Sequence, residues 1–166
     1  PTDGVVTQWG QVEAMIGLGT GLENDLTGRE NAELGARLAG IDGDAARRYA
    51  AEALEFAELG AMANAPVSTY SSGMRARLGF ALATGRSPDV LLVDEVLSTG
   101  DAAFRKRADR RIDDLFDRAG AVVLVTHNMS EIERRCNRAI LLDEGRIVYD
   151  GRPKEALRRY KSASRA

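Results

Sequence analysis

The chain has 166 residues, of which 44% are hydrophobic and 5% aromatic, and this size and composition suit one domain with a buried core. With 23 basic and 25 acidic residues its net charge is −2, so no overall field attracts it to nucleic acid or to anionic lipid. The single cysteine, Cys136, excludes an internal disulfide and fits a reducing compartment, and no stretch approaches the ~20 apolar residues of a membrane-spanning helix.

The first half of the chain predicts two short strands followed by helices. We expect the strands at about residues 5–7 and 12–16, as a hairpin. Thr27 and Glu30 have the spacing of a capping box at the start of a helix over about 29–39. After a Gly-Ile-Asp-Gly turn, a second helix over about 45–59 leads to a third over 72–84. Residues 27–85 are therefore expected to form a helical subdomain.

The third helix begins with small hydroxyl residues and a glycine: Ser71, Ser72 and Gly73. The first N–H groups of a helix have no partner within it, and the positive end of the helix dipole lies there, so this segment favours an anion that approaches closely at the glycine. An ordinary serine N-cap explains the same residues.

A run of four apolar residues, 90–93, lacks polar alternation and predicts the central strand of a sheet covered on both faces. Asp94 and Glu95 follow it. In open α/β sheets the carboxyl end of a strand lines the ligand crevice, and hard oxygen ligands there suit Mg²⁺ bound to phosphates. The alternative is two acidic residues in a strand-to-turn loop.

A second strand of the buried type is predicted over 121–126, and it leads into His127, the only histidine of the chain. His127 at the same sheet edge as Asp94 would be able to touch a phosphate, although a lone histidine is often structural. Between the two strands, Ser98 and Asp101 have the spacing of a capping box before a charged helix over about 102–118, and capping alone would explain them.

The last third of the chain predicts a short helix at 130–135, a hairpin of strands 139–142 and 146–149, and a helix from Pro153 to about residue 161. We expect Cys136 to be inert. The basic runs at 105–111 and 152–165 are explained as solvated helix faces, with contact to a membrane or a partner as the alternative.

Taken in order, these segments resemble the nucleotide-binding domain of ATP-binding cassette (ABC) transporters over nearly the whole chain. Residues 70–74 resemble the signature motif, with Ser72 in place of the first of its usual two glycines and Met74 in place of glutamine. Residues 91–94 resemble the Walker B strand and 98–101 the D-loop. The resemblance makes Glu95 the catalytic glutamate and His127 the switch histidine. The implied fold class is α/β, a P-loop NTPase-like ABC ATPase core with a helical signature-motif subdomain.

The amino-acid sequences of three segments, 26–31, 70–78 and 100–104, are similar to those of the ATPase subunits of bacterial surface-polysaccharide exporters. These exporters carry lipopolysaccharide O-antigen, capsule or teichoic acid. This resemblance implies an ATP-hydrolysing subunit that powers export through an integral membrane permease. It implies a peripheral location on the cytoplasmic face of the bacterial inner membrane, with no nucleic acid partner.

The resemblance also implies a division of labour for ATP hydrolysis with Mg²⁺. Asp94 would hold Mg²⁺ through a water molecule, Glu95 would orient or deprotonate the attacking water, and His127 would contact the γ-phosphate. In a head-to-tail homodimer, the signature segment would close on ATP held by the Walker A loop of the opposite subunit. Asp101 of the D-loop, which begins at Ser98, would bridge the two sites across that interface.

A Walker A loop ending in Gly-Lys-Ser/Thr is missing from these residues. No Gly-Lys pair occurs, and none of the three lysines, Lys106, Lys154 and Lys161, follows a phosphate-type loop. The glycine-rich stretch 17–21 is read as a structural turn. Residues 1–6 resemble the family segment that follows the Walker A helix, so we expect a truncated single domain that begins after this loop and does not hydrolyse ATP by itself. Its expected parts are the subdomain 27–85, a Walker B, D-loop and switch core over 86–150, and a C-terminal helix over 153–163.

The Q-loop residue that couples such a domain to its permease is not evident. Gln8 and Gln11 lie before the turn where it should fall, Gly17 occupies that turn, and Glu23 is a weak substitute. Two alternative functions stay open. One is a catalytically dead regulatory module that lost its P-loop, and the other is a soluble cassette ATPase of the DNA-repair type, which would need a long coiled-coil insertion.

Overall fold

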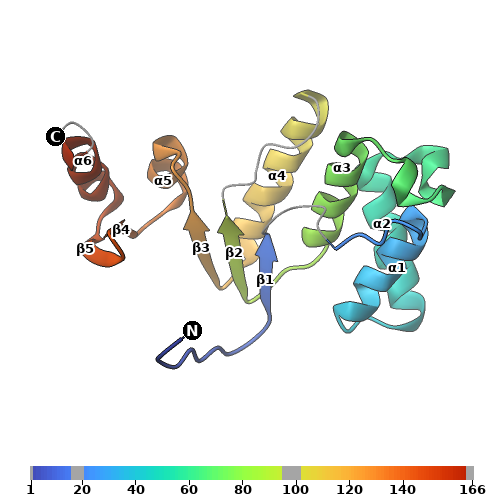
Figure 1. Cartoon of the computed structure of the whole chain (residues 1–166), viewed down its shortest axis with the longest axis horizontal. Helices are drawn as coiled ribbons and strands as arrows, with labels where there is room; N and C mark the ends of the chain where they lie inside the picture. The colour runs from blue at the N-terminus through green and yellow to red at the C-terminus, as the bar shows by residue number, and fades with distance from the viewer. Residues whose placement is uncertain (1, 16–20, 95–101, 164–166) are drawn as a thin grey trace. The chain divides into compact units, whose positions relative to one another are not determined.

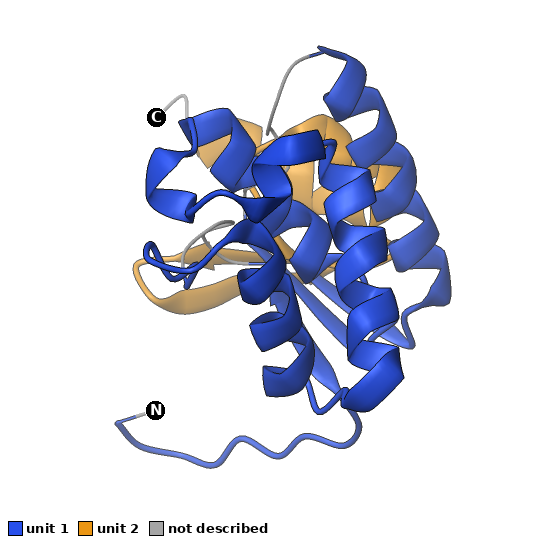
Figure 2. Cartoon of the chain, turned by 90° about the vertical axis from the view of Figure 1, so that its right-hand side faces the viewer, with its two compact units in different colours: residues 1–123 blue, residues 124–166 orange. Residues whose placement is uncertain are grey.

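The computed structural model describes residues 2–15, 21–94 and 102–163. The chain divides into two compact units, residues 1–123 and residues 124–166 (Figure 2). The first unit holds a helical part and most of a small sheet, and the second holds a hairpin and two helices (Figure 1). No helix within the described ranges combines the length and the apolar character needed to cross a bilayer.

The helical part of the first unit has three α-helices, α1 (Gly28–Leu38), α2 (Gly43–Ala57) and α3 (Ser72–Ala83). Two short 3₁₀ turns, η1 (Gly60–Asn64) and η2 (Val67–Thr69), connect α2 to α3. The predicted capping box is confirmed, because Thr27 Oγ1 accepts from the Glu30 N–H and Glu30 Oε2 accepts from the Thr27 N–H. The three helices expected from periodicity and capping are therefore present, with bounds shifted by one or two residues.

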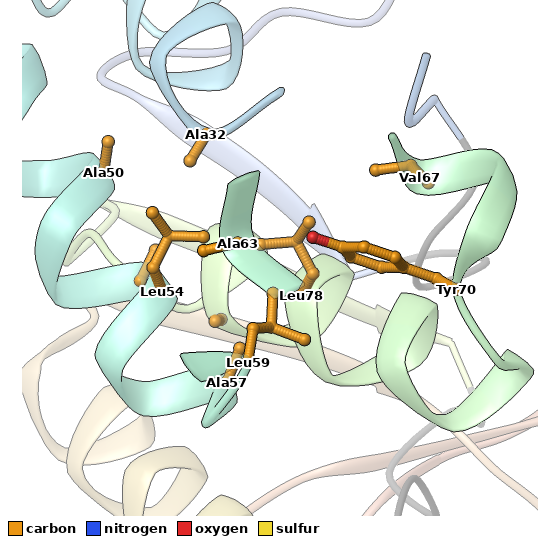
Figure 3. Close-up of a cluster of buried hydrophobic side chains, with 11 residues drawn as sticks. Ala32, Ala50, Leu54, Ala57, Leu59, Ala63, Val67, Tyr70 and Leu78 are labelled. Atoms are coloured by element: carbon orange, nitrogen blue, oxygen red, sulfur yellow. The ribbon is translucent and has the colours of Figure 1, made fainter. Parts of the chain in front are cut away.

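Small side chains form much of the core that joins these helices (Figure 3). Six of its eleven buried residues are alanines, which let the helix backbones approach closely. The full set is Ala32, Ala50, Ala53, Leu54, Ala57, Leu59, Ala63, Val67, Tyr70, Leu78 and Ala81. Tyr70 is the one member with a polar group, and its hydroxyl donates to the Met62 carbonyl oxygen at 2.6 Å, so no hydrogen bond is lost by its burial.

The sheet has the strand order β1 (Val12–Met15), β2 (Val90–Asp94), β3 (Ala121–Val125). β1 and β2 are parallel and in register from Val12 opposite Val90 to Met15 opposite Val93. The prediction that residues 90–94 form a central strand is confirmed by this order. Leu91 and Val93 are 1% and 2% exposed, so one face of β2 is fully buried in the core.

The helix α4 (Ala102–Arg118) is held to the helical part by three phenylalanine rings. Phe56 of α2 stacks on Phe80 of α3 with ring centroids 5.8 Å apart, and Phe104 of α4 meets both rings edge-on at 5.5 and 5.7 Å. Such offset-stacked and edge-to-face pairs add to the gain from burying the rings. This aromatic triad fixes α4 against α2 and α3.

Two expectations about strands were wrong. Residues 5–7 form no strand, and Val5 and Val6 are 91% and 77% exposed, because no segment in the described part of the chain pairs with their backbone. β3 is not buried on both faces: its exposure alternates, with Val123 52% and Val125 60% exposed. β3 lies at the end of the strand order, so it has one strand neighbour and less cover than β2.

The second unit contains α5 (Met129–Arg135), the antiparallel strands β4 (Ala139–Asp143) and β5 (Arg146–Gly151), and α6 (Pro153–Ala163). The expected turn is present: Glu144 and Gly145 have φ of 45° and 76°, the left-handed pair that matches the twist of a two-residue hairpin. Arg138 and Asp150 form a two-pronged ion pair at 2.7 and 2.6 Å. α6 packs on the hairpin, with the Arg159 guanidinium 4.6 Å from the centre of the Tyr149 ring.

Candidate functional site

The signature segment forms the N-terminus of α3. Ser71 is its N-cap, in an extended backbone conformation, and its Oγ accepts from the Met74 N–H at 3.2 Å. The N–H groups of Ser72 and Gly73 have no partner among the described residues, as is usual in a first helical turn. The capping role is thus confirmed, and two adjacent N–H donors remain available at the positive end of the helix dipole. Ser71 and Ser72 are both exposed.

Gly73 leaves space at this helix end. A Cβ atom on Gly73 would meet only Ser71 Oγ, at 3.9 Å, which is an ordinary van der Waals contact. The internal packing of the chain therefore does not require glycine here. A missing side chain beside free N–H donors is the arrangement that lets a phosphate approach the backbone closely.

Arg75 ties this helix end to the loop that precedes α1. Its Nη1 atom donates to Asn24 Oδ1 at 2.7 Å and to the Val67 carbonyl oxygen at 3.3 Å. The partners come from before and after the first two helices, so the side chain joins three segments at one point. Sequence reasoning did not single out Arg75, and its charge alone gave no sign of these partners.

Asn31 fixes the same loop from the other side. It is 3% exposed, its Oδ1 accepts from the Glu23 N–H at 2.7 Å, and its Nδ2 donates to the carbonyl oxygens of Glu23, Leu26 and Thr27 at 2.9 to 3.2 Å. The buried amide is therefore fully paired. An asparagine on the apolar face of an amphipathic helix was the sequence signal for this role, and it went unnoticed.

Asp94 ends β2 and is exposed at the carboxyl end of this central strand. An exposed carboxylate with hard oxygen atoms at that position fits Mg²⁺. In the described ranges no three His, Cys, Asp or Glu side chains come together as metal ligands. A Mg²⁺ ion on Asp94 would accordingly take further ligands from water and phosphate oxygens. Glu95, Ser98 and Asp101 lie outside the described residues.

His127 follows β3 and is exposed in the second unit. The turn around it is fixed by local hydrogen bonds. Thr126 Oγ1 accepts from the Asn128 N–H at 3.0 Å, and the Asn128 side chain caps α5 by accepting from the Ser130 N–H at 3.1 Å. Asp94 belongs to the first unit, so the approach of His127 to Asp94 stays a prediction. Ser71, Ser72 and Gly73 are the predicted site residues that lie together, on one helical turn.

Comparison with known proteins gives concordant matches. Residues 3–98, more than half of the chain, match the family model described as ABC transporter. The O-antigen export system ATP-binding protein RfbB of Klebsiella pneumoniae is 39% identical over 98% of the chain, which spans 66% of that protein. The teichoic acids export ATP-binding protein TagH of Lactococcus lactis is 36% identical over 89% of the chain, which spans 32% of that protein.

A solved structure shares the fold. The ATP-binding cassette MJ0796, a dimer in a post-hydrolysis state bound to ADP and Pi, matches with a TM-score of 0.64 and 24% identity, covering 86% of this chain and 63% of its own. At this identity the match shows the fold alone, an α/β P-loop NTPase-like ABC core with a helical signature-motif subdomain. Together with the family model, it establishes that the chain belongs to the ABC transporter family.

Proposed function

We propose that the protein is the ATP-binding and ATP-hydrolysing subunit of an exporter that carries a cell-surface polysaccharide through a membrane permease. The observation that carries this proposal is the start of α3, where Ser71, two free N–H groups and the space at Gly73 lie together on one helical turn. The names of the relatives, O-antigen and teichoic acid export ATP-binding proteins, support polysaccharide as the exported class. The location that follows is peripheral, on the cytoplasmic face of the bacterial inner membrane.

The signature turn is proposed to act on ATP held by a second subunit. Ser71 Oγ and the N–H groups of Ser72 and Gly73 would donate to the γ-phosphate, and these donors suit an anion but do not include a lysine or a glycine-rich loop. The remaining contacts to the ATP phosphates would therefore come from a Walker A loop, which these 166 residues do not contain. A head-to-tail homodimer of a complete protein that includes this loop would supply it, and the dimeric state of MJ0796 supports a dimer.

Hydrolysis is proposed to use residues at the ends of β2 and β3. Asp94 would hold Mg²⁺ through water, and the bound ion would neutralise phosphate charge. Glu95 would orient or deprotonate the attacking water, and His127 would contact the γ-phosphate. Asp101, in the D-loop segment that begins at Ser98, would connect the two sites of the dimer.

A glycine pair tests the signature turn in the complete protein. Gly73→Ala should leave stability nearly unchanged, because its methyl group meets only Ser71 Oγ at 3.9 Å, yet it should reduce ATP hydrolysis strongly by filling the space for phosphate. The matched control is Gly35→Ala in α1, where a Cβ atom meets Leu82 at 3.8 Å and hydrolysis should be retained. Equal hydrolysis by the wild type and Gly73→Ala would contradict the assignment of this turn.

The catalytic carboxylate has its own test. Glu95→Gln should stop turnover while ATP stays bound, since the amide cannot take a proton from water. Unchanged turnover would remove Glu95 from the mechanism. The 166-residue chain by itself should not hydrolyse ATP, and Mg²⁺-dependent hydrolysis by the purified chain would contradict that proposal. Loss of surface polysaccharide on deletion of the gene tests the substrate class.

A further inference from the structure

A cavity of about 430 Å³ lies in the first unit, away from the signature turn. Its walls come from α2, from the turn between α3 and β2, and from one face of α4. Five arginines line it, against two carboxylates, Glu52 and Asp114; the arginines are Arg86, Arg107, Arg110, Arg111 and Arg118. We call it the arginine cavity. Its volume lies in the range of small-molecule sites.

Three of these arginines lack a carboxylate partner. Arg86 pairs with Glu13 at 3.1 Å and Arg107 with Glu58 at 2.6 Å. Within the described ranges, Arg110, Arg111 and Arg118 form no ion pair. The spacing of the arginines along α4 places Arg107, Arg111 and Arg118 on one helix face. The cavity lining therefore has more arginines than carboxylates even after the two ion pairs with Glu13 and Glu58 are counted, which leaves a net positive charge.

Arg111 is held in position for a ligand. Its guanidinium lies 4.4 Å from the centre of the Phe56 ring, and its Nε donates to the Thr84 carbonyl oxygen at 3.1 Å. Stacking and one hydrogen bond fix the plane of the group while its terminal nitrogen atoms keep their donors. Burial lowers the pKa of Arg111, with Tyr49 and Glu52 acting in the opposite direction, so the charge is desolvated where it stands.

Arg107 adds an unsatisfied donor. Its Nη1 atom binds Glu58, but its Nη2 atom is buried and has no hydrogen-bond partner in the part of the chain that the structure describes. Buried nitrogen donors are nearly always paired, so Arg107, which lines the cavity, has donor capacity that the described residues do not use. Phosphate and carboxylate oxygens are the acceptors that a guanidinium fork matches.

We propose that the arginine cavity binds a small polyvalent oxyanion, a molecule with two or more phosphate or carboxylate groups. Two anionic groups are needed because the guanidinium groups without an ion pair, those of Arg110, Arg111 and Arg118, are spread along about two turns of α4. The cavity lies outside the residues proposed for ATP hydrolysis, so the site is separate from the nucleotide site. It gives the basic run of α4 a function that a solvated helix face would not have.

Titration calorimetry with the protein tests the proposal. The probes are inorganic pyrophosphate and citrate, and inorganic phosphate, which has a single anionic group, is the comparison. Pyrophosphate or citrate should bind saturably and more tightly than phosphate. The pair of probes distinguishes phosphate groups from carboxylate groups as the recognised chemistry. The double variant Arg110→Gln/Arg118→Gln should weaken the binding by about tenfold or more. Both residues are exposed, so the variant should keep the wild-type circular dichroism spectrum.

The matched control is Arg105→Gln/Lys106→Gln, which removes the same charge from exposed positions of α4 that do not line the cavity. It should bind the probes as the wild type does. Ser71→Ala should also leave the binding unchanged. The proposal is overturned if no probe binds saturably, if both double variants lose affinity equally, or if Ser71→Ala abolishes the binding while Arg110→Gln/Arg118→Gln retains it. Should the first double variant unfold, the wild type provides the test. Pyrophosphate should protect the cavity arginines from modification by phenylglyoxal, and no protection would overturn the proposal.

Discussion

The hydroxyl of Tyr70 lies directly against Gly28: a Cβ atom on this glycine would clash with Tyr70 Oη. Gly28 is the first residue of α1, and Tyr70 comes directly before the N-cap of α3. The same hydroxyl donates to the Met62 carbonyl oxygen. The first turn of α1 therefore helps to position Tyr70, the residue directly before the signature turn. This close contact requires a glycine at position 28.

Gly28→Ala should destabilise the protein. Alanine is favoured over glycine in helices by about 1 kcal/mol, but the contact with Tyr70 is too short to be absorbed, and overpacking of this kind costs about 1–3 kcal/mol. We expect a net loss of up to about 2 kcal/mol in the free energy of unfolding, measured by urea denaturation.

Gly35→Ala is the control for this substitution on the same helix. Its Cβ atom would meet Leu82 at 3.8 Å, an ordinary contact, so the helix propensity of alanine should stabilise by about 0.5–1 kcal/mol. Tyr70→Phe in the Gly28→Ala background should recover part of the loss, because it removes the clashing oxygen. Equal effects of Gly28→Ala and Gly35→Ala would show that the Tyr70 contact does not decide the outcome.

Substitutions of Ser71 should separate its capping role from its proposed role toward ATP. Ser71→Ala removes the acceptor for the Met74 N–H and should cost about 1 kcal/mol of stability. Ser71→Asp keeps a good cap, so stability should be retained, but its negative charge faces the proposed γ-phosphate position and should suppress hydrolysis. Denaturation curves and ATPase rates of the complete protein measure the two effects. Normal hydrolysis by Ser71→Asp would contradict the proposed contact.

The capping box at α1 should make stability depend on pH in the acid range. Hydrogen bonds from the backbone N–H and the hydroxyl of Thr27 lower the pKa of Glu30 below its ordinary value of 4.5. A lowered folded-state pKa gives a stabilisation that is present above about pH 4.5 and is lost as the pH falls through the folded-state pKa. Glu30→Gln removes this titration.

The stability difference between the wild type and Glu30→Gln should therefore shrink as the pH is lowered from 6 to 3. Chemical denaturation at each pH measures it. Glu55→Gln on the exposed face of α2, where the side chain caps no helix, is the matched control. A difference that stays constant over this range would mean that the charge of Glu30 does not contribute to the cap.

Cys136 should react slowly with thiol reagents. Burial raises the pKa of its thiol, the negative charge of Glu131 raises it further, and Arg135 acts in the opposite direction. Less of the nucleophilic thiolate is then present at pH 8 than for an ordinary cysteine. Glu131→Gln should lower the pKa and increase the rate. Reaction as fast in the native protein as in urea would contradict this prediction.

Local rules predicted much of the fold. The capping box at Thr27 and the hairpin turn at Glu144 and Gly145 depend on residues within a few positions of one another, so the sequence displays them directly. The contact of Arg75 with Asn24 joins positions 51 apart, and the Tyr70 contact with Gly28 joins positions 42 apart. These depend on how the helices pack, which periodicity does not specify.

The strand errors have the same origin. An apolar pattern shows that a segment is able to form a strand, but pairing requires a neighbour, and residues 5–7 have none in the described part of the chain. β3 has an apolar sequence but only one strand neighbour in the order, so its burial was overestimated. For the candidate site, sequence identified Ser71, Ser72 and Gly73 as one turn, whereas Asp94 and His127 lie in different units.

The aromatic triad of Phe56, Phe80 and Phe104 makes α2, α3 and α4 respond together to a small displacement, because interdigitated rings transmit strain instead of absorbing it. α3 carries the signature turn at one end, and α4 begins directly after residues 98–101. A push on the start of α3 by a bound phosphate would therefore reach the start of α4 through the two rings that connect them. Through these ring contacts, the helix that begins at Ser72 packs against the helix that follows the proposed D-loop segment.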